Sequence, residues 1–216
     1  MTIRALVLPG GSYRHHAPHE AEPVVAWLRA LGVEADIFRY PVGMAHPAAH
    51  DAIGARIAEL RGAGADRVLL VGFSAGGHAA GLAALRPADA TRRVDGLVLG
   101  YPVVSLEKHS HQGSSEVLLG DEDTPARRAA LSLESLVTAA APASFLFHSF
   151  DDQKVPVEHS LLLSSAMHHA GIPHELHLYP LGGHGCGLGG DLVPWTNACA
   201  AWLAREGWLS DGSIPA

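Results

Sequence analysis

The chain of 216 residues is 48% hydrophobic and 17% charged, which excludes a disordered chain and a coiled coil. Its length predicts one domain over residues 1–216 and leaves no room for a large second domain. A net charge of −7 argues against nucleic acid or a membrane surface as the main partner, and two cysteines cannot form a disulfide framework.

Short apolar runs alternate with longer helical patterns along the chain. In order, the pattern predicts a strand at 3–8, a helix at 20–31, a strand at 33–40, a helix at 48–63, a strand at 67–73, a helix at 76–85, a strand at 94–99, an irregular, partly helical segment at 105–141, a strand at 143–150, a helix at 160–170, a strand at 173–179 and a helix at 194–205. This alternation predicts an α/β fold with a mainly parallel six-stranded sheet and helices on both faces. Ligands bind such sheets beyond the carboxyl ends of the strands.

Two apolar segments bear on export and membrane insertion. The apolar run before Pro9 is shorter than the roughly 7–15 residues of a secretory signal, so we expect a cytoplasmic protein. Residues 68–85 carry no charge and have the length of a membrane span. Their glycines, Ser74 and His78 instead indicate a buried strand that continues into a buried helix.

Fifteen histidines are an unusually large number for this length. None of them has the spacing of a known zinc motif, so we expect no metal. We expect most of them to lie at the surface. Full protonation would move the net charge from −7 to +8, so solubility should change sharply below about pH 6.5.

Residues 72–76 read Gly-Phe-Ser-Ala-Gly, between an apolar strand and a helix of small residues. This G-x-S-x-G pattern in this context is typical of a nucleophile elbow, a tight turn that exposes a serine hydroxyl. The pattern predicts Ser74 as a nucleophile. The alternative is an ordinary turn serine.

A serine nucleophile needs a histidine base and an acid that orients it, in the chain order serine, acid, histidine. His184 follows the sixth predicted strand among glycines and is the predicted base. Asp151 and Asp152 both follow the fifth strand. Asp152 lies further past the strand and is favoured as the acid, which leaves Asp151 as a cap or turn residue.

The oxyanion hole needs backbone N–H groups aimed at the oxygen that gains charge. One donor is expected from Ala75, directly after the predicted nucleophile. The other is expected from Gly11 or Ser12, in the loop after the first strand, where glycines allow a close approach of the backbone.

Seven segments together resemble one known group of enzymes. They are PGGSY at 9–13, EAEPVVAWL at 20–28, GFSAGGHAAG at 72–81, YPVVSL at 101–106, HQGSSEVLLG at 111–120, FLFHSFDDQKVPVEHS at 145–160 and GGHGCGL at 182–188. The chain resembles the α/β-hydrolase superfamily, and within it the small acetyl-esterase branch that includes acetyl xylan esterases.

The resemblance implies an α/β-hydrolase fold that lacks the first two strands and a cap domain, with a triad of Ser74, Asp152 and His184. It implies a serine carboxylesterase that hydrolyses short-acyl, above all acetyl, esters of small molecules such as acetylated sugars, through an acyl-enzyme and without a cofactor. Pro9 and Ser12 depart from the HGGG loop of related esterases, where a histidine and the third glycine stand.

The same residues are compatible with other functions. The same triad serves peptidases, thioesterases and lactone hydrolases, and a non-catalytic ligand-binding relative belongs to another class. Carbohydrate-active relatives are often exported, so export is an alternative to a cytoplasmic location. The sequence does not indicate an oligomeric state. Cys186 stands two residues after His184, which suggests either redox control or, as we favour, a small space-filling side chain.

Overall fold

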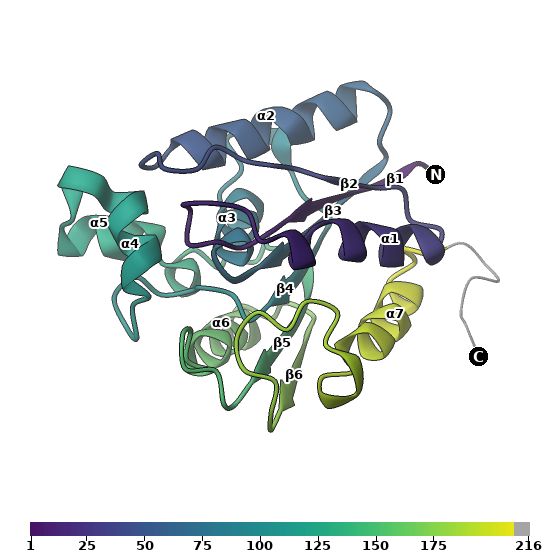
Figure 1. Ribbon diagram of the computed structural model, residues 1–216. Helices are drawn as coiled ribbons and strands as arrows, with labels where there is room; N and C mark the ends of the chain where they lie inside the picture. The colour runs from purple at the N-terminus through teal and green to yellow at the C-terminus, as the bar shows by residue number, and fades with distance from the viewer. Residues whose placement is uncertain (210–216) are drawn as a thin grey trace.

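The computed structural model describes residues 1–209. Its centre is a six-stranded sheet in the order β2-β1-β3-β4-β5-β6, and every neighbouring pair is parallel (Figure 1). The strands are β1 (Ile3–Leu8), β2 (Ala35–Ile37), β3 (Arg67–Phe73), β4 (Gly96–Gly100), β5 (Ala143–Ser149) and β6 (His174–Tyr179). The predicted parallel α/β sheet is confirmed.

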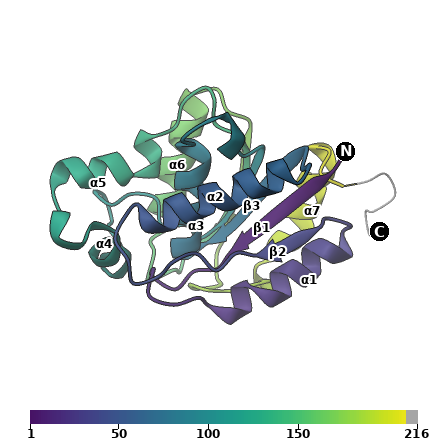
Figure 2. The ribbon, with the colours of Figure 1, turned by 90° about the horizontal axis from the view of Figure 1, so that it is seen from above.

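Helices cover both faces of the sheet (Figures 1 and 2). They are α1 (Glu22–Ala30), α2 (Ala48–Gly62), α3 (Ser74–Leu85), α4 (Gln112–Leu119), α5 (Pro125–Leu131), α6 (Glu158–His169) and α7 (Trp195–Arg205). Short 3₁₀ turns are η1 (Pro18–Glu20), η2 (Ala90–Arg92), η3 (Gly120–Glu122), η4 (Leu133–Ser135) and η5 (Gly190–Leu192). Within residues 1–209, the insertion between β4 and β5 holds only α4, α5 and short turns, so no separate cap domain is formed.

Alternate residues of β1 enter two different cores, as the two-residue period of a strand requires. Ala5 and Val7 pack in a core with α1 and α7, while Leu6 and Leu8 pack in a core with α2, α3 and α6. All four side chains are almost completely buried. This burial on both faces explains why the strands read as continuous apolar runs.

Several element boundaries differ from the sequence prediction. The second strand has only three residues instead of 33–40, because the chain leaves the sheet after Ile37 and Tyr40 turns back to donate a hydrogen bond to the carbonyl oxygen of Pro9. The first helix begins at Glu22, after the separate turn η1, in which Glu20 is buried. Helix α3 begins at Ser74 rather than Gly76. The remaining ends shift by one or two residues.

The segment 105–141 contains two real helices, α4 and α5. Both are short, and α4 begins with the polar run 112–116, so no long apolar period marks them in the sequence. His111 caps α4, because its Nδ1 accepts a hydrogen bond from the backbone N–H of Ser114. Thr124 caps α5 through the N–H of Arg127. Local capping therefore defines these helices more than amphipathicity does.

The histidines are less exposed than expected. Only five are exposed and seven are half-buried. His78, His148 and His159 are fully buried. Each of these three uses both ring nitrogens in hydrogen bonds, for example His78 with the Tyr13 hydroxyl and the Leu131 carbonyl. The expectation that most histidines lie at the surface is therefore wrong for these three, which are structural parts of the interior.

Buried histidines should make the protein less stable in mild acid. Burial lowers the pKa of His78 and of His159 to about 4. Between about pH 6.5 and pH 4, these two histidines are protonated in the unfolded chain but stay neutral in the folded one. The free energy of unfolding therefore falls as the pH drops through this range. Each histidine contributes up to about 1.4 kcal/mol per pH unit. Urea unfolding at pH 7 and pH 5 measures this loss.

The matched variants are His78→Gln, which removes one titrating group, and His168→Gln at an exposed position of α6. The first should flatten the pH dependence of the unfolding free energy, whatever its effect on stability at pH 7. The second should leave the dependence unchanged. Equal stability of the unmodified protein at pH 7 and pH 5 would contradict the expectation.

Candidate active site

Ser74 stands at a sharp turn between β3 and α3, with a left-handed φ of 51°. Gly72 and Gly76 permit this turn. A Cβ on Gly72 would come within 2.5 Å of the Gly76 oxygen, and one on Gly76 would collide with the carbonyl oxygens of Leu8 and Pro9. A serine in this conformation costs about 1–3 kcal/mol, which the surrounding structure must offset. The predicted strand–turn–helix is present, and the two glycines are steric requirements.

The structure brings Ser74, His184 and Asp152 into one hydrogen-bonded chain. His184 Nε2 lies 2.9 Å from Ser74 Oγ, and His184 Nδ1 lies 2.7 Å from Asp152 Oδ2. The ring of Tyr101 packs edge-on against His184, with 5.0 Å between centroids. The His184 side chain is 13% exposed and that of Asp152 is fully buried. The arrangement can therefore move a proton from the serine hydroxyl to the imidazole while a buried carboxylate faces the other ring nitrogen.

Asp152 is held as a carboxylate by four donors. Its Oδ1 accepts the backbone N–H groups of Lys154 and Val155, each at 2.9 Å. Burial by itself raises the pKa of this carboxyl, but hydrogen bonds from His148 and His184 outweigh burial and hold the pKa well below its usual range. Asp152 is therefore ionised at neutral pH and available to orient an imidazole.

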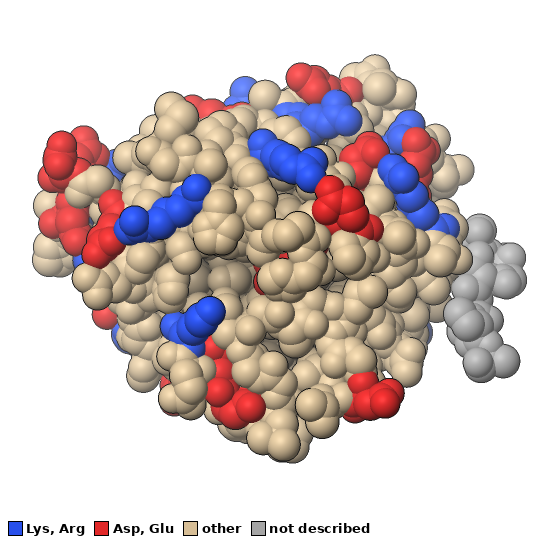
Figure 3. Space-filling view, viewed as in Figure 1, with Lys and Arg blue, Asp and Glu red and all other residues tan. Residues whose placement is uncertain are grey.

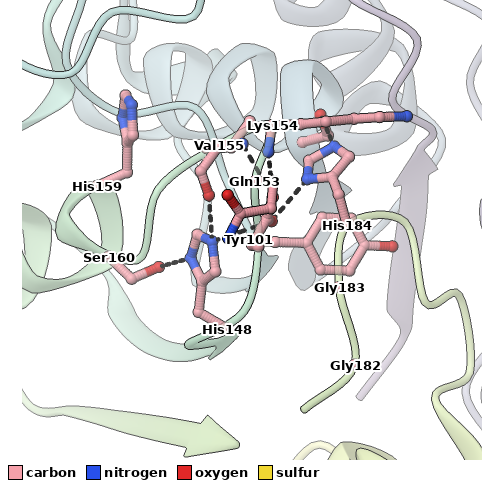
Figure 4. Close-up of polar contacts among 12 residues, drawn as sticks. Tyr101, His148, Gln153, Lys154, Val155, His159, Ser160, Gly182, Gly183 and His184 are labelled. Atoms are coloured by element: carbon pink, nitrogen blue, oxygen red, sulfur yellow. Dashed lines mark hydrogen bonds and ion pairs between the residues drawn. The ribbon is translucent and has the colours of Figure 1, made fainter. Parts of the chain in front are cut away.

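A second imidazole shares this carboxylate. His148, on β5, places its Nε2 3.3 Å from Asp152 Oδ2 and 2.8 Å from the carbonyl oxygen of Val155, while its Nδ1 meets the Ser160 hydroxyl at 2.8 Å (Figure 4). His148 is not among the site residues that the sequence motifs predict. Its position four residues before Asp152 on a buried strand is the one sequence signal that could have pointed to it.

Asp151 anchors the loop that carries His184. Its carboxylate accepts the N–H of Gly183 at 2.8 Å and that of Gly182 at 3.3 Å. Asp151 lies in the turn after β5, as expected, and its carboxylate also bonds a loop about 30 residues further along the chain, which the sequence did not indicate. Asp152 therefore contacts the imidazole of His184, and its neighbour Asp151 holds the loop that carries this histidine.

The loop after β1 runs beside Ser74 in an unusual backbone conformation. Gly11, Ser12 and Tyr13 all have positive φ angles, of 128°, 56° and 58°. Gly11 and Ser12 line the same cleft as Ser74. Ala75 is the second residue of α3, where backbone N–H groups have no partner within the helix. The three predicted oxyanion residues thus flank Ser74 from two elements.

Two tyrosines hold this loop in place. The Tyr13 hydroxyl meets Nδ1 of His78 on α3 at 2.8 Å, and the Tyr40 hydroxyl donates to the carbonyl oxygen of Pro9 at 2.7 Å. Both tyrosines are 1% exposed, and their rings pack edge-on. Sequence reasoning missed both, because the partners come from different elements.

The cleft at Ser74 is small and is lined mostly by polar and small residues. It measures about 210 Å³, below the roughly 300–1,000 Å³ of typical ligand pockets. Its lining residues are mostly polar or small: Gly11, Ser12, His15, Ala17, His19, Glu20, Ser74, His111, Lys154, His184 and Gly185. The face that Figure 3 shows is hollowed near its centre and carries few charged side chains around the hollow. None of these lining residues has a large apolar side chain that could receive a long acyl chain.

Metal binding, membrane insertion and the reactivity of Cys186 can each be judged from residues 1–209. No cluster of three or more His, Cys, Asp or Glu side chains in this range is arranged to hold a metal ion. No helix in this range is long and apolar enough to cross a bilayer. Burial raises the pKa of the Cys186 thiol to about 12. Because the thiolate is the reactive form, this agrees with the favoured space-filling interpretation of Cys186.

The profile of the prolyl oligopeptidase family matches residues 52–207. The chain belongs to the prolyl oligopeptidase family. This family lies within the α/β-hydrolase superfamily, so the fold expected from the sequence motifs is confirmed. The match includes the segments that carry Ser74, Asp152 and His184.

Solved structures place this family member near esterases. An acetyl ester-xyloside bifunctional hydrolase from Caldicellulosiruptor lactoaceticus is 36% identical, with a TM-score of 0.89 over 97% of this chain and 85% of that chain. A carboxylesterase from Lactobacillus plantarum WCFS1 is 24% identical, with a TM-score of 0.84 over 98% of this chain and 88% of that chain. The second likeness shows the fold alone.

A curated relative is much longer than this family member. Endo-1,4-beta-xylanase B from Butyrivibrio fibrisolvens is 28% identical over 207 residues, which cover 86% of this chain and 33% of the xylanase. The chain therefore spans about a third of the length of the curated relative that it matches.

Proposed function

We propose that this protein is a serine esterase that hydrolyses short-acyl esters, above all acetyl esters, through an acyl-enzyme. The observation that carries the proposal is the hydrogen-bonded chain from Ser74 through His184 to Asp152, at a small cleft lined mostly by polar and small residues. The likeness to an acetyl ester-xyloside hydrolase at 36% identity supports acetylated sugars as substrates.

In the proposed mechanism, Ser74 Oγ attacks the ester carbonyl carbon as its proton passes to His184 Nε2. Asp152 holds the ring by its Nδ1–H and stabilises the imidazolium. The tetrahedral intermediate collapses, the alcohol leaves with the proton from His184, and an acyl-enzyme remains. Water then attacks with His184 as base, which releases the acid and restores Ser74.

The developing oxyanion needs at least two N–H donors. We assign one to Ala75, at the free N-terminal end of α3, and the other to Gly11 or Ser12. The constrained backbone of these two residues favours this assignment, because a preorganised donor does not have to reorient during the reaction.

The cleft predicts a preference for short acyl chains. In a series of p-nitrophenyl esters, kcat/KM should be highest for acetate and fall at least tenfold by octanoate, because none of the lining residues has a large apolar side chain that could pack against the added methylenes. Triton micelles loaded with a long-chain ester should give no jump in rate. Hydrolysis of acetylated xylosides and glucosides by the same preparation then identifies the alcohol side.

A rate maximum at octanoate, or strong activation by micellar substrate, would contradict the short-acyl preference. The family name makes peptide hydrolysis the second candidate, so aminoacyl p-nitroanilides belong in the same series. A higher kcat/KM on these amides than on acetate esters would replace the esterase proposal by a peptidase.

A further inference from the structure

Glu20 is a buried acid next to the cleft, with its side chain 3% exposed. Its Oε2 accepts the backbone N–H of Gly10 at 2.7 Å, and its Oε1 accepts the Tyr101 hydroxyl at 2.8 Å. Within residues 1–209, its one ion-pair partner is Nε2 of His19, at 3.6 Å. Burying a carboxylate among neutral donors costs free energy, so a glutamate at this position needs a structural or functional reason.

The first bond fixes the loop beside the proposed nucleophile. A Cβ on Gly10 would lie 2.8 Å from Glu20 Oε2 and 2.9 Å from Ser74 Cβ, so the Gly10 peptide is held tightly between these two residues. Gly11 and Ser12, the proposed donors to the oxyanion, follow directly. The Glu20 carboxylate therefore sets where this backbone lies relative to Ser74.

The second bond reaches the loop that carries His184. The Tyr101 oxygen, which donates to Glu20, also accepts the N–H of Gly187 at 3.2 Å. Tyr101 follows β4 directly and has a positive φ of 35°. Its ring packs against His184. One carboxylate thus connects the end of β1, the end of β4 and the loop after β6.

We infer that Glu20 is a positioning residue, which aligns the oxyanion donors with Ser74 directly and supports the His184 loop through Tyr101. The inference rests on the proposed esterase function. The oxyanion donors and His184 both stabilise the transition state. Loss of the Glu20 carboxylate should therefore lower kcat and leave KM nearly unchanged.

The test compares Glu20→Gln with the unmodified protein on p-nitrophenyl acetate. The amide keeps the shape but has one accepting oxygen, so Gly10 and Tyr101 can no longer both donate to it. We expect kcat per active site, titrated with an organophosphate, to fall about 10- to 100-fold, with KM within about twofold. Loss of an entire oxyanion donor would cost about 10²–10³.

An inhibitor pair separates positioning from a merely structural role. A trifluoromethyl ketone forms a hemiketal oxyanion, so its Ki should rise in parallel with the loss of kcat/KM. The Ki of acetate, a ground-state product, should stay unchanged. The matched control is Glu22→Gln, because Glu22 is exposed, lies two residues further and pairs with Arg39 at the surface. It should retain the unmodified kcat.

Tyr101→Phe is the second variant, since it removes one hydroxyl and keeps the buried ring. It decides the matter if Glu20→Gln does not fold, and we expect a fall in kcat of about tenfold. Unmodified kcat and ketone Ki in the folded variants would overturn the role of Glu20 and leave the esterase proposal intact. An unmodified protein that neither hydrolyses p-nitrophenyl acetate nor reacts with the organophosphate would overturn the esterase proposal itself.

Discussion

Ser74→Ala should lower kcat for p-nitrophenyl acetate by at least about 10⁴-fold, because no acyl-enzyme can form without the hydroxyl. The substitution should not disturb the fold. Alanine is smaller than serine and accepts the same φ of 51° about as well, and the lost hydroxyl is hydrogen-bonded to the His184 ring rather than to a structural partner. Initial rates and thermal unfolding of the purified variant measure the two effects separately.

A fluorophosphonate probe gives an independent readout of the same residue. It should label the folded protein at Ser74 and fail to label the alanine variant. Ser164→Ala is a matched control, because Ser164 lies on α6 and contacts the ring of His174 instead. Hydrolysis by Ser74→Ala at more than a hundredth of the unmodified rate would contradict Ser74 as the nucleophile.

Asp152→Asn should cost about 10⁴-fold in kcat while the protein stays folded. All four partners of the carboxylate are hydrogen-bond donors. The amide oxygen can take the place of Oδ1 before Lys154 and Val155, which turns the NH₂ group toward His184. Nδ1 of His184 must then accept, so the proton moves to Nε2 and the ring can no longer receive the proton of Ser74. Steady-state kinetics at pH 7 measure the loss.

Asp151→Asn is the matched neighbour. Its amide oxygen can still accept the N–H of Gly183, so the His184 loop should be weakened rather than lost, with kcat within about tenfold of the unmodified protein. If the two variants lost activity equally, the assignment of Asp152 rather than Asp151 as the orienting acid would be wrong.

The parts of this molecule that follow local rules were predictable. Strand–helix alternation predicts a parallel sheet, and the carboxyl ends of its strands are where Ser74, Asp152 and His184 lie. The glycines at 72 and 76 signal the turn, because a side chain at either position collides with backbone. At these two positions the glycines that mark the motif in the sequence are also the residues that the packing of the turn requires.

The supporting residues were not predictable, because their roles depend on partners from other elements. In the sequence, Glu20 looks like an ordinary acidic residue in the first turn of a helix. Its role becomes visible only in the structure, where Gly10 and Tyr101 each donate a hydrogen bond to it. His148 reads as one of many histidines, and burial beside Asp152 distinguishes it. The short second strand was mispredicted because Tyr40 continues the apolar run while bonding to Pro9 instead of the sheet.

The position of β6 has a consequence for how activity would be gained and lost. This strand is the last of those within residues 1–209, lies at one edge of the sheet, is only half-buried along its length and leads directly into the His184 loop. The contact between His184 and Ser74 spans 110 residues of chain. Such contacts form late in folding, and edge strands open early in native fluctuations. During gradual unfolding, esterase turnover should therefore be lost when β6 opens. The spectroscopic signals of the buried core should change only later.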